Sequence, residues 1–494
     1  MLSLGIRFLS GMKMPQKMLL IAVIFLVPIA YLLVVYERNL NSQIEFTQLE
    51  IDGVRQIEPA RKIIQSMQLH RGVSQLALAG NEGAKAKLVD IKAQVAAAIE
   101  EQNKVDEVLG RVFNTKEEWK KLRSEWQALA AKAETLAAPE SFKSHTAVIA
   151  LAQDFIILTA DRSNMTLDPD LETFYLIDAF ATKIIRATEF SGQMRAMSVR
   201  SLQSGAISTE DRMELAVLAR LIGRDQADID IGLDKVGQVN ADAKLALAAP
   251  RQALKGAFDT YLKLVQAEVI SPEVPQGDPA NMLKVASGAI DAAYAMNDVA
   301  RTEFKRLAGE RVDRLKSERL RSIVAVGIAL LVVFYLFLAF RSSLITAIQA
   351  IAGMARRMAG GDFSQAAHVK SSDEMAEIAR ELNTTQSSLR DKIEAERVIA
   401  QANLRIKNAL DVSSTNVMVA DTDGNIIYCN TSVMAMLRNA ESDIRGQLPD
   451  FRADAVLGSN FDRFHRNPSH QRNLLGALRS THRVEIQVGG RTFL

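Results

Sequence analysis

The sequence predicts a mainly α-helical protein with two transmembrane helices, a helical bundle between them, and a coiled helical module followed by a small α/β module after the second span. Two uncharged apolar segments, 18–36 and 322–340, are close to the ~20 residues that a helix needs to cross a bilayer. Between them, apolar residues recur with helical periodicity, and strict alternation is absent. Alternating strand-like segments occur only after residue 405.

Composition excludes several classes of protein. The 60 basic residues nearly balance the 58 acidic ones, and a formal net charge of +2 argues against a nucleic-acid-binding protein. Cys429 is the only cysteine, so intramolecular disulfides and Cys-rich metal sites are excluded. We therefore expect no metal site, no catalytic residues and no nucleic-acid partner.

The two apolar segments have alternative interpretations. The first could be a signal peptide, but no small-residue cleavage site follows it. The second could be a buried core helix, but it is apolar on every face. Both are therefore expected to span a membrane.

Basic residues orient the spans. Arg7, Lys13 and Lys17 lie in the tail 1–17, which contains no acid, so this tail is expected in the cytoplasm. Long segments cross the membrane largely regardless of charge, and 37–321 is such a segment. It is therefore expected outside the cytoplasm, with the chain after residue 340 inside.

The segment 37–321 is expected to contain about eight helices, arranged as two stacked four-helix bundles. Turn residues separate the helices. Asp168 before Pro169 predicts an N-cap with Pro at the first helical position, and Ser208 with Asp211 predicts a second helix start.

A weak internal repeat suggests a ligand site in this segment. Arg71 and Ser74 stand near the end of one long helix, and Arg195 and Ser198 have the same spacing near the end of another. The functional interpretation is a pair of sites in which an arginine binds a small anion bidentately. The alternative, which we favour from sequence alone, is that the arginines lie on the protein surface and that the repeat only marks the ends of two helices.

Four other residues of this segment have simple structural interpretations. His70 and His145 are isolated in the sequence and require no metal. Trp119 and Trp126 are seven positions apart, on one helical face, and are expected in the core.

Residues 341–393 have a heptad pattern interrupted by Gly360-Gly361-Asp362-Phe363. The two predicted seams are Leu344, Ile348, Ile351, Ala355, Met358 and Met375, Ile378, Leu382, Leu389, Ile393. With "SDEMAEIARELN" opening the second helix, the segment resembles a HAMP domain, although it lacks a proline near 344–346. The resemblance implies a parallel homodimer that relays motion; a plain coiled-coil stalk is the alternative. A helical linker, 394–404, follows.

Residues 405–494 are predicted to contain strands at 417–420, 426–429 and 484–488, a short helix at 433–437, and a fourth strand starting at 491. A strand that begins without a later partner leaves an unpaired edge, so we expect an incomplete domain with an output module further on.

"NVMVADTDGNIIYCN" and "VEIQVGGRTF" in this segment resemble the PAS domain of methyl-accepting chemotaxis receptors. "SNMTLDPDLETFYLIDAF" at 163–180 resembles a stretch common in the periplasmic helical domains of these receptors. Some PAS domains of this group bind haem b through a histidine in a Phe-His-x-Asn-Pro turn, which is His465 here, and His470 matches a position near that pocket. The alternative is a PAS domain without a cofactor.

The resemblance implies a receptor in the bacterial inner membrane and not an enzyme. Its expected partners are a periplasmic or small-molecule ligand, membrane lipid, other copies of itself in homodimers and clusters, and a cytoplasmic histidine kinase with its adaptor. The alternative is a sensor histidine kinase or diguanylate cyclase with the same sensor, HAMP and PAS arrangement.

Overall fold

The computed structural model describes residues 2–465 and 467–494, and the chain divides into two compact units, 1–332 and 333–494. Each unit is described by itself. Both are dominated by helices, which confirms the mainly α class predicted from sequence.

The first unit begins with α1 (Leu2–Ser10) and the long helix α2 (Met14–Leu78). The apolar side chains of 18–36 are exposed, including Phe25 at 67% and Leu32 at 64%. In α10 (Pro279–Ala359) the segment 322–340 is equally exposed, with Leu331 and Tyr335 at 70% each. These two helices are long and apolar enough to cross a membrane, and neither apolar segment is the buried core of a globular domain.

The rest of α2 packs with α3 (Glu82–Val112), α4 (Lys116–Lys132) and α5 (Ala138–Arg162). The Asn81 side chain caps α3 by accepting a hydrogen bond from the Ala84 amide. Trp119 and Trp126 are 3% and 5% exposed, so α4 buries the apolar face predicted from their spacing.

A second group of helices is built from α6 to α10. After the short turn η1 (Met165–Leu167), the chain forms the elements α6 (Leu171–Ile177), η2 (Asp178–Lys183), α7 (Ile184–Ser204), α8 (Thr209–Val239), α9 (Ala241–Val265) and η3 (Gln266–Ile270) before α10. Ser208 caps α8 through the Asp211 amide, as predicted. The predicted cap at Asp168 is wrong: α6 starts at Leu171 with Asp170 at its N-cap. The Asp168 carboxylate accepts from the amide of Asp170, before the helix, and also from Arg311.

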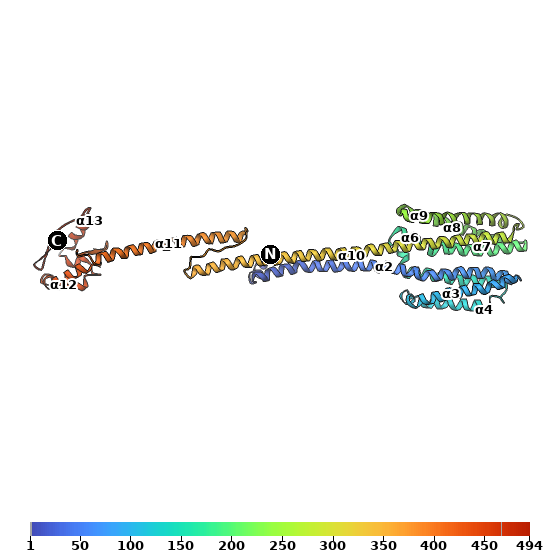
Figure 1. The fold of residues 1–494 in the computed structure, drawn as a ribbon, viewed down its shortest axis with the longest axis horizontal. Helices are drawn as coiled ribbons and strands as arrows, with labels where there is room; N and C mark the ends of the chain where they lie inside the picture. Colours follow the sequence, from blue (N-terminus) through green and yellow to red (C-terminus); the bar gives the residue numbers. More distant parts are fainter. Residues whose placement is uncertain (1, 466) are drawn as a thin grey trace. The chain divides into compact units, whose positions relative to one another are not determined.

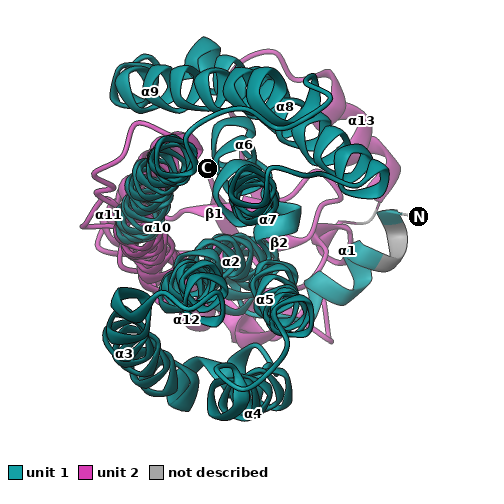
Figure 2. Cartoon of the chain, turned by 90° about the vertical axis from the view of Figure 1, so that its right-hand side faces the viewer, with its two compact units in different colours: residues 1–332 teal, residues 333–494 magenta. Residues whose placement is uncertain are grey.

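The two groups lie side by side and share one continuous core, so they are not placed end to end (Figures 1 and 2). They meet where α2 passes α7. Glycine permits this close approach, since a Cβ on Gly72 would lie 3.4 Å from Nη2 of Arg195 and one on Gly192 would lie 2.8 Å from Nη2 of Arg71. The close contact of α2 and α7 places residues of both groups around one site.

In the second unit, the last turns of α10 pack with α11 (Glu374–Asp411) through Met354, Ala367 and Ala379. The connector between these helices is held by Asn383, whose side chain accepts from the amide of Ala367 and donates to its carbonyl. The predicted break at 360–363 is present, with Gly361 in the left-handed region at φ +84°.

The C-terminal α/β part has two antiparallel hairpins around a small core. Its strands are β1 (Met418–Ala420), β2 (Ile426–Cys429), β3 (Ile486–Val488) and β4 (Arg491–Phe493), which agree with the predicted positions within a few residues. Its helices are α12 (Thr431–Arg445), η4 (Ala453–Ala455), η5 (Phe461–Phe464) and α13 (Pro468–Ala477). The predicted helix at 433–437 is thus one part of the longer α12.

Candidate functional site

The contact between α2 and α7 brings together the two arginines of the sequence repeat. Arg71 is 1% exposed and Arg195 is 7% exposed. The two residues lie on neighbouring helices, and the backbone of each helix approaches the guanidinium of the other at a glycine. They are therefore buried parts of one interface and not surface arginines.

Arg71 has a counter-ion that the sequence did not reveal. Its Nη1 lies 2.5 Å from Oε1 of Glu189, and its Nη2 lies 3.1 Å from Oε2. Gln68 and Gln193 donate to the same carboxylate, at 3.0 and 2.7 Å. Thr146 accepts a further hydrogen bond from Arg71. The charge of Arg71 is therefore neutralised within the fold.

Arg195 forms no ion pair within the described part of the chain. Its Nη1 donates to the hydroxyl oxygen of Ser287 on α10, at 2.9 Å. The two copies of the repeat differ at the position six residues before the arginine. The copy that contains Arg195 has Glu189 there, the partner of Arg71, whereas the copy that contains Arg71 has the uncharged Gln65. Burial lowers the pKa of the Arg195 guanidinium, and the neighbouring Arg71 adds to this effect. Arg195 is thus a buried cation without a neutralising carboxylate.

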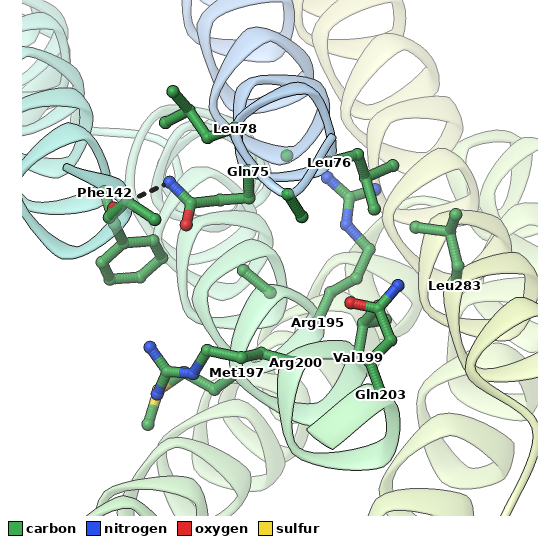
Figure 3. A pocket seen from close by; sticks show the side chains of 14 residues that line it. Gln75, Leu76, Leu78, Phe142, Arg195, Met197, Val199, Arg200, Gln203 and Leu283 are labelled. Carbon is green, nitrogen blue, oxygen red and sulfur yellow. Dashed lines mark hydrogen bonds between the residues drawn. The ribbon is translucent and has the colours of Figure 1, made fainter. Parts of the chain in front are cut away.

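Two cavities adjoin Arg195. One of about 170 Å³ lies between α2, α5 and α7, and its lining includes Gln75, Leu76, Phe142, Met197, Gln203 and Leu283 (Figure 3). In Figure 3 the Arg195 side chain extends toward Leu76, with Leu283 beside it. The second cavity, about 450 Å³, is shared with α3 and includes Lys87 and Asp90. The smaller cavity has a mostly apolar wall with the buried Arg195 and the exposed Arg200 as its cations, and such a lining is suited to a small anion.

The two serines of the repeat lie outside these cavities. Ser74 is buried, with its Oγ 3.2 Å from Nδ1 of His70. Ser198 is buried too, and its hydroxyl has no hydrogen-bond partner among the described residues. The structure therefore brings the predicted arginines together without placing the predicted serines beside the cavities.

His70 and His145, isolated in sequence, form a buried pair beside Arg71. His145 donates from Nδ1 to the Ser141 carbonyl at 2.6 Å, so its Nε2 accepts from Nδ1 of His70 at 2.8 Å. Burial lowers the pKa of His70 to about 3 and that of His145 to about 4, which keeps both rings neutral at physiological pH. The pair therefore adds no charge to the interface.

A second buried charged cluster lies where α2 and α10 meet the loop before α6. Arg311 contacts three carboxylates: Glu50 at 3.1 Å, Asp168 at 3.1 Å and Asp170 at 2.7 Å. Its Nη2 also donates to Oγ1 of Thr173 at 2.6 Å. Burial and the neighbouring Asp168 raise the pKa of Glu50 to about 9, against the opposing effect of Arg311. The cluster fastens both membrane-directed helices to the loop.

The two histidines singled out in the C-terminal part differ in environment. His465 lines an apolar cavity of about 280 Å³, together with Met418, Met436, Leu437, Phe464, Ile486 and Phe493. Its Nδ1 lies 2.8 Å from the Phe461 carbonyl. Donation from Nδ1 to this carbonyl leaves the Nε2 lone pair available as a ligand. His470 is exposed and does not line this cavity.

Comparison with known proteins identifies two domain families in the chain. Residues 339–391 match the HAMP domain family, and residues 404–468 match the PAS domain family. A 121-residue segment is 48% identical to the methyl-accepting chemotaxis protein McpB of Pseudomonas aeruginosa; it covers 24% of this chain and 18% of that protein. The solved structure of the NasR transcription antiterminator is 16% identical, with a TM-score of 0.45, over 72% of this chain and 98% of that one.

The HAMP match agrees with the segment predicted from the heptads and the glycine break, and the PAS match lies in the predicted α/β segment. The alignment with McpB spans less than a fifth of that relative. The chain thus contains a HAMP domain and a PAS domain and is related to the methyl-accepting chemotaxis proteins, as its sequence motifs predicted.

Proposed function

We propose that this chain is the sensing part of a transmembrane chemoreceptor that binds a small anion between its two helical bundles. The observation that carries the proposal is Arg195, a buried guanidinium that adjoins two cavities and forms no ion pair with the described residues. A charge removed from water requires a partner of opposite sign. A planar anion could accept two parallel N–H bonds from the guanidinium fork.

The charges around the site favour an anion of low charge. Glu189 neutralises Arg71, and the paired histidines are neutral. Arg200, which also lines the smaller cavity, pairs with Asp211, so Arg195 is the cation of that cavity without a carboxylate partner among the described residues. The lining is otherwise mostly apolar, which disfavours a heavily hydrated polyanion.

Hydrogen bonds connect the site to α10, the helix that contains the second apolar segment. Arg195 donates to Ser287 of α10. Tyr294, also on α10, donates to Gln68 at 2.8 Å, and Gln68 donates to Glu189 at 3.0 Å. An anion that took hydrogen bonds from Arg195 would compete with Ser287, so binding would alter the restraints on α10. We propose that this change passes along α10 to the HAMP domain.

The test is ligand-induced stabilisation of the purified full chain in nanodiscs. The probes are sodium nitrate, acetate, sulfate and phosphate, compared with sodium chloride at equal ionic strength. A ligand at a hundred times its Kd stabilises the folded state by ~2.7 kcal/mol, which raises the Tm.

Arg195→Gln should abolish this rise, and Arg195→Lys should weaken it because a single ammonium lacks the planar fork. Arg220→Gln is the matched control, since Arg220 is exposed on α8. If no anion raises the Tm above the chloride value, or if the rise survives Arg195→Gln, the anion site is wrong.

The remaining architecture is proposed on the family relationship and the exposed spans. We place 37–321 in the periplasm, the two spans in the bacterial inner membrane, and HAMP and PAS in the cytoplasm, with PAS as a second input. The homodimer expected from HAMP should form a disulfide between two copies carrying Ile351→Cys, and absence of that crosslink in membranes would contradict the parallel dimer.

The output of the receptor would control a histidine kinase through an adaptor. A sensor histidine kinase or diguanylate cyclase with the same front end remains the alternative. Reading the gene beyond codon 494 separates these proteins. A long heptad-patterned helical hairpin after residue 494 would support the chemoreceptor. A kinase or cyclase domain there would show instead that the protein is an enzyme with the same sensor.

A second candidate function is haem binding by the PAS domain. His465 lines an apolar cavity, and the bond from Nδ1 to the Phe461 carbonyl leaves its Nε2 lone pair free, so this histidine could hold the iron of haem b. Bound haem would supply an iron site for a diatomic gas such as oxygen. His470, exposed outside the cavity, is not proposed as a ligand.

The full chain, loaded with haemin, should show a Soret band that His465→Ala abolishes and His470→Ala retains. A colourless wild-type protein after haemin loading would refute this candidate function.

A further inference from the structure

The short helix α1 has two chemically different faces. Leu2, Ile6 and Leu9 recur at the i, i+4, i+7 spacing of one helical stripe, while Arg7 and Ser10 lie together on another. On this stripe Leu2 is 83% exposed and Ile6 is 61% exposed. The apolar stripe of α1 is therefore open.

α1 is separate from the first span. The backbone of Lys13 is extended, with φ −67° and ψ 150°, so the helix is interrupted between Ser10 and Met14. The Lys13 amide donates to Oε1 of Gln16 at 2.9 Å, which caps the start of α2. This cap gives α1 an axis of its own. Residues 11–13 connect α1 to α2, and the apolar segment begins at residue 18.

The charges of this region have a single sign. Arg7 lies on α1, Lys13 at the break and Lys17 just before the span, whereas the first acidic residue of the chain is Glu37, beyond the span. An apolar helix face with adjacent cations is complementary to the boundary between acyl chains and anionic headgroups.

We propose that α1 lies in the plane of the membrane interface, with Leu2, Ile6 and Leu9 among the acyl chains and with its basic residues on anionic phospholipid headgroups of the cytoplasmic leaflet. This inference rests on the proposed membrane insertion of 18–36. Continuity with that segment favours lipid over a protein partner, because only residues 11–17 separate α1 from it. In this position α1 would restrain the height and rotation of α2.

The experiment measures the depth of single labels in the full chain. Cys429→Ala removes the only native thiol, and Leu9→Cys, Ser10→Cys or Phe25→Cys then introduces one site for an environment-sensitive fluorophore. Each labelled protein is placed in nanodiscs of phosphatidylcholine alone or with phosphatidylglycerol, with and without brominated acyl chains as quencher.

In the anionic nanodiscs the label at position 9 should lose most of its fluorescence to the quencher, and the label at position 10 should lose less. Arg7→Gln together with Lys13→Gln should reduce the quenching at position 9 to the level in phosphatidylcholine alone. Equal quenching in both lipids would overturn the anionic preference. A water-exposed label at position 9, whether α1 is free or contacts a protein, would overturn the interfacial position.

The label at position 25 separates this inference from the proposed span. Quenching at position 25 without quenching at position 9 leaves the span intact and refutes only the interfacial helix. Absence of quenching at both positions refutes the span and the interfacial helix together. Position 10 shares the Cys429→Ala background, so a folding defect of that background would affect both α1 labels equally.

Discussion

Arg311 on α10 places its Nη1 3.1 Å from Oε2 of Glu50 on α2. These residues belong to the two helices that contain the apolar segments, and both side chains are buried. With Asp168 and Asp170 on the same guanidinium, the contact fixes α2 and α10 to the loop that joins the two bundles. A movement of α10 along α2 must therefore rearrange this cluster or carry its loop with it.

Glu50→Gln should stabilise the protein most at high pH. The pKa of Glu50 is about 9 in the folded chain, against an ordinary value of 4.5. As pH rises above 4.5 the unfolded chain loses this proton first, so the free energy of unfolding of the wild type falls toward pH 9. Glutamine does not titrate. Thermal unfolding at pH 5 and pH 8 should show a larger Tm advantage for Glu50→Gln at pH 8, and an equal difference at both pH values would contradict the raised pKa.

Arg311→Ala should be strongly destabilising, by ~3–5 kcal/mol, because it leaves the buried Asp168 carboxylate without its cation. Arg311→Lys should recover only part of the loss, since one ammonium cannot reproduce the contacts that three guanidinium nitrogens make. Arg314→Ala is the control, because Arg314 is exposed three residues further along α10. Circular dichroism melts of the three variants compare the losses, and similar Tm values for Arg311→Ala and Arg314→Ala would argue against the cluster.

Gly53→Ala should destabilise the first unit by ~1–3 kcal/mol, the range for overpacking a core. A Cβ at Gly53 would lie 2.2 Å from Oγ and 2.5 Å from Cβ of Ser163, so α2 and the end of α5 must separate. Gly223→Ala is the matched helical control: no atom lies within 4 Å of its added Cβ. Without a clash, alanine at 223 should stabilise by ~0.5–1 kcal/mol. Thermal melts should therefore show a lower Tm for Gly53→Ala and a higher Tm for Gly223→Ala. An unchanged Tm for Gly53→Ala would contradict the close approach of α2 to Ser163.

Asn430→Ala should loosen the junction between α11 and the PAS domain. The fully buried Asn430 side chain donates to the carbonyls of Leu410 and Thr415 and accepts from the amides of Val417 and Val433. Each buried group left unsatisfied costs ~1–3 kcal/mol. Hydrogen exchange should accelerate at Val417 and Val433 in Asn430→Ala but remain unchanged in the exposed control Asn439→Ala. Unchanged protection in both variants would show that the junction does not depend on this side chain.

Local sequence signals predicted the elements that depend on local chemistry. The spans follow from uninterrupted apolar length, the start of α8 from Ser208, and the β1–β2 hairpin from Asp421 to Gly424. In that turn, Oδ1 of Asp421 accepts from the amides of Asp423 and Asn425, and Gly424 adopts φ +88°. Such interactions involve neighbours in the chain, so they can be inferred without knowing which helices meet.

The candidate site was only partly predictable for the same reason. The repeat pointed to Arg71 and Arg195, but Glu189 and His145, the partners of Arg71 and His70, lie 118 and 75 residues away in the chain. Asp168 was predicted as a helix cap from its neighbour Pro169, but its contact with Arg311, 143 residues away, could not be foreseen from that neighbour. Helical periodicity identifies which face of a helix is buried, but it does not identify the helix that packs against that face.

By itself, the sequence determined the helical class, the two apolar segments, the glycine break of the HAMP domain and the hairpin of the PAS domain, because apolar length, periodicity and turn chemistry are properties of contiguous residues. The tertiary structure alone decided that Arg71 is neutralised and Arg195 is not. That difference depends on the packing of α7 against α2, which places Glu189 on the guanidinium of Arg71 and leaves Arg195 hydrogen-bonded only to Ser287 among the described residues.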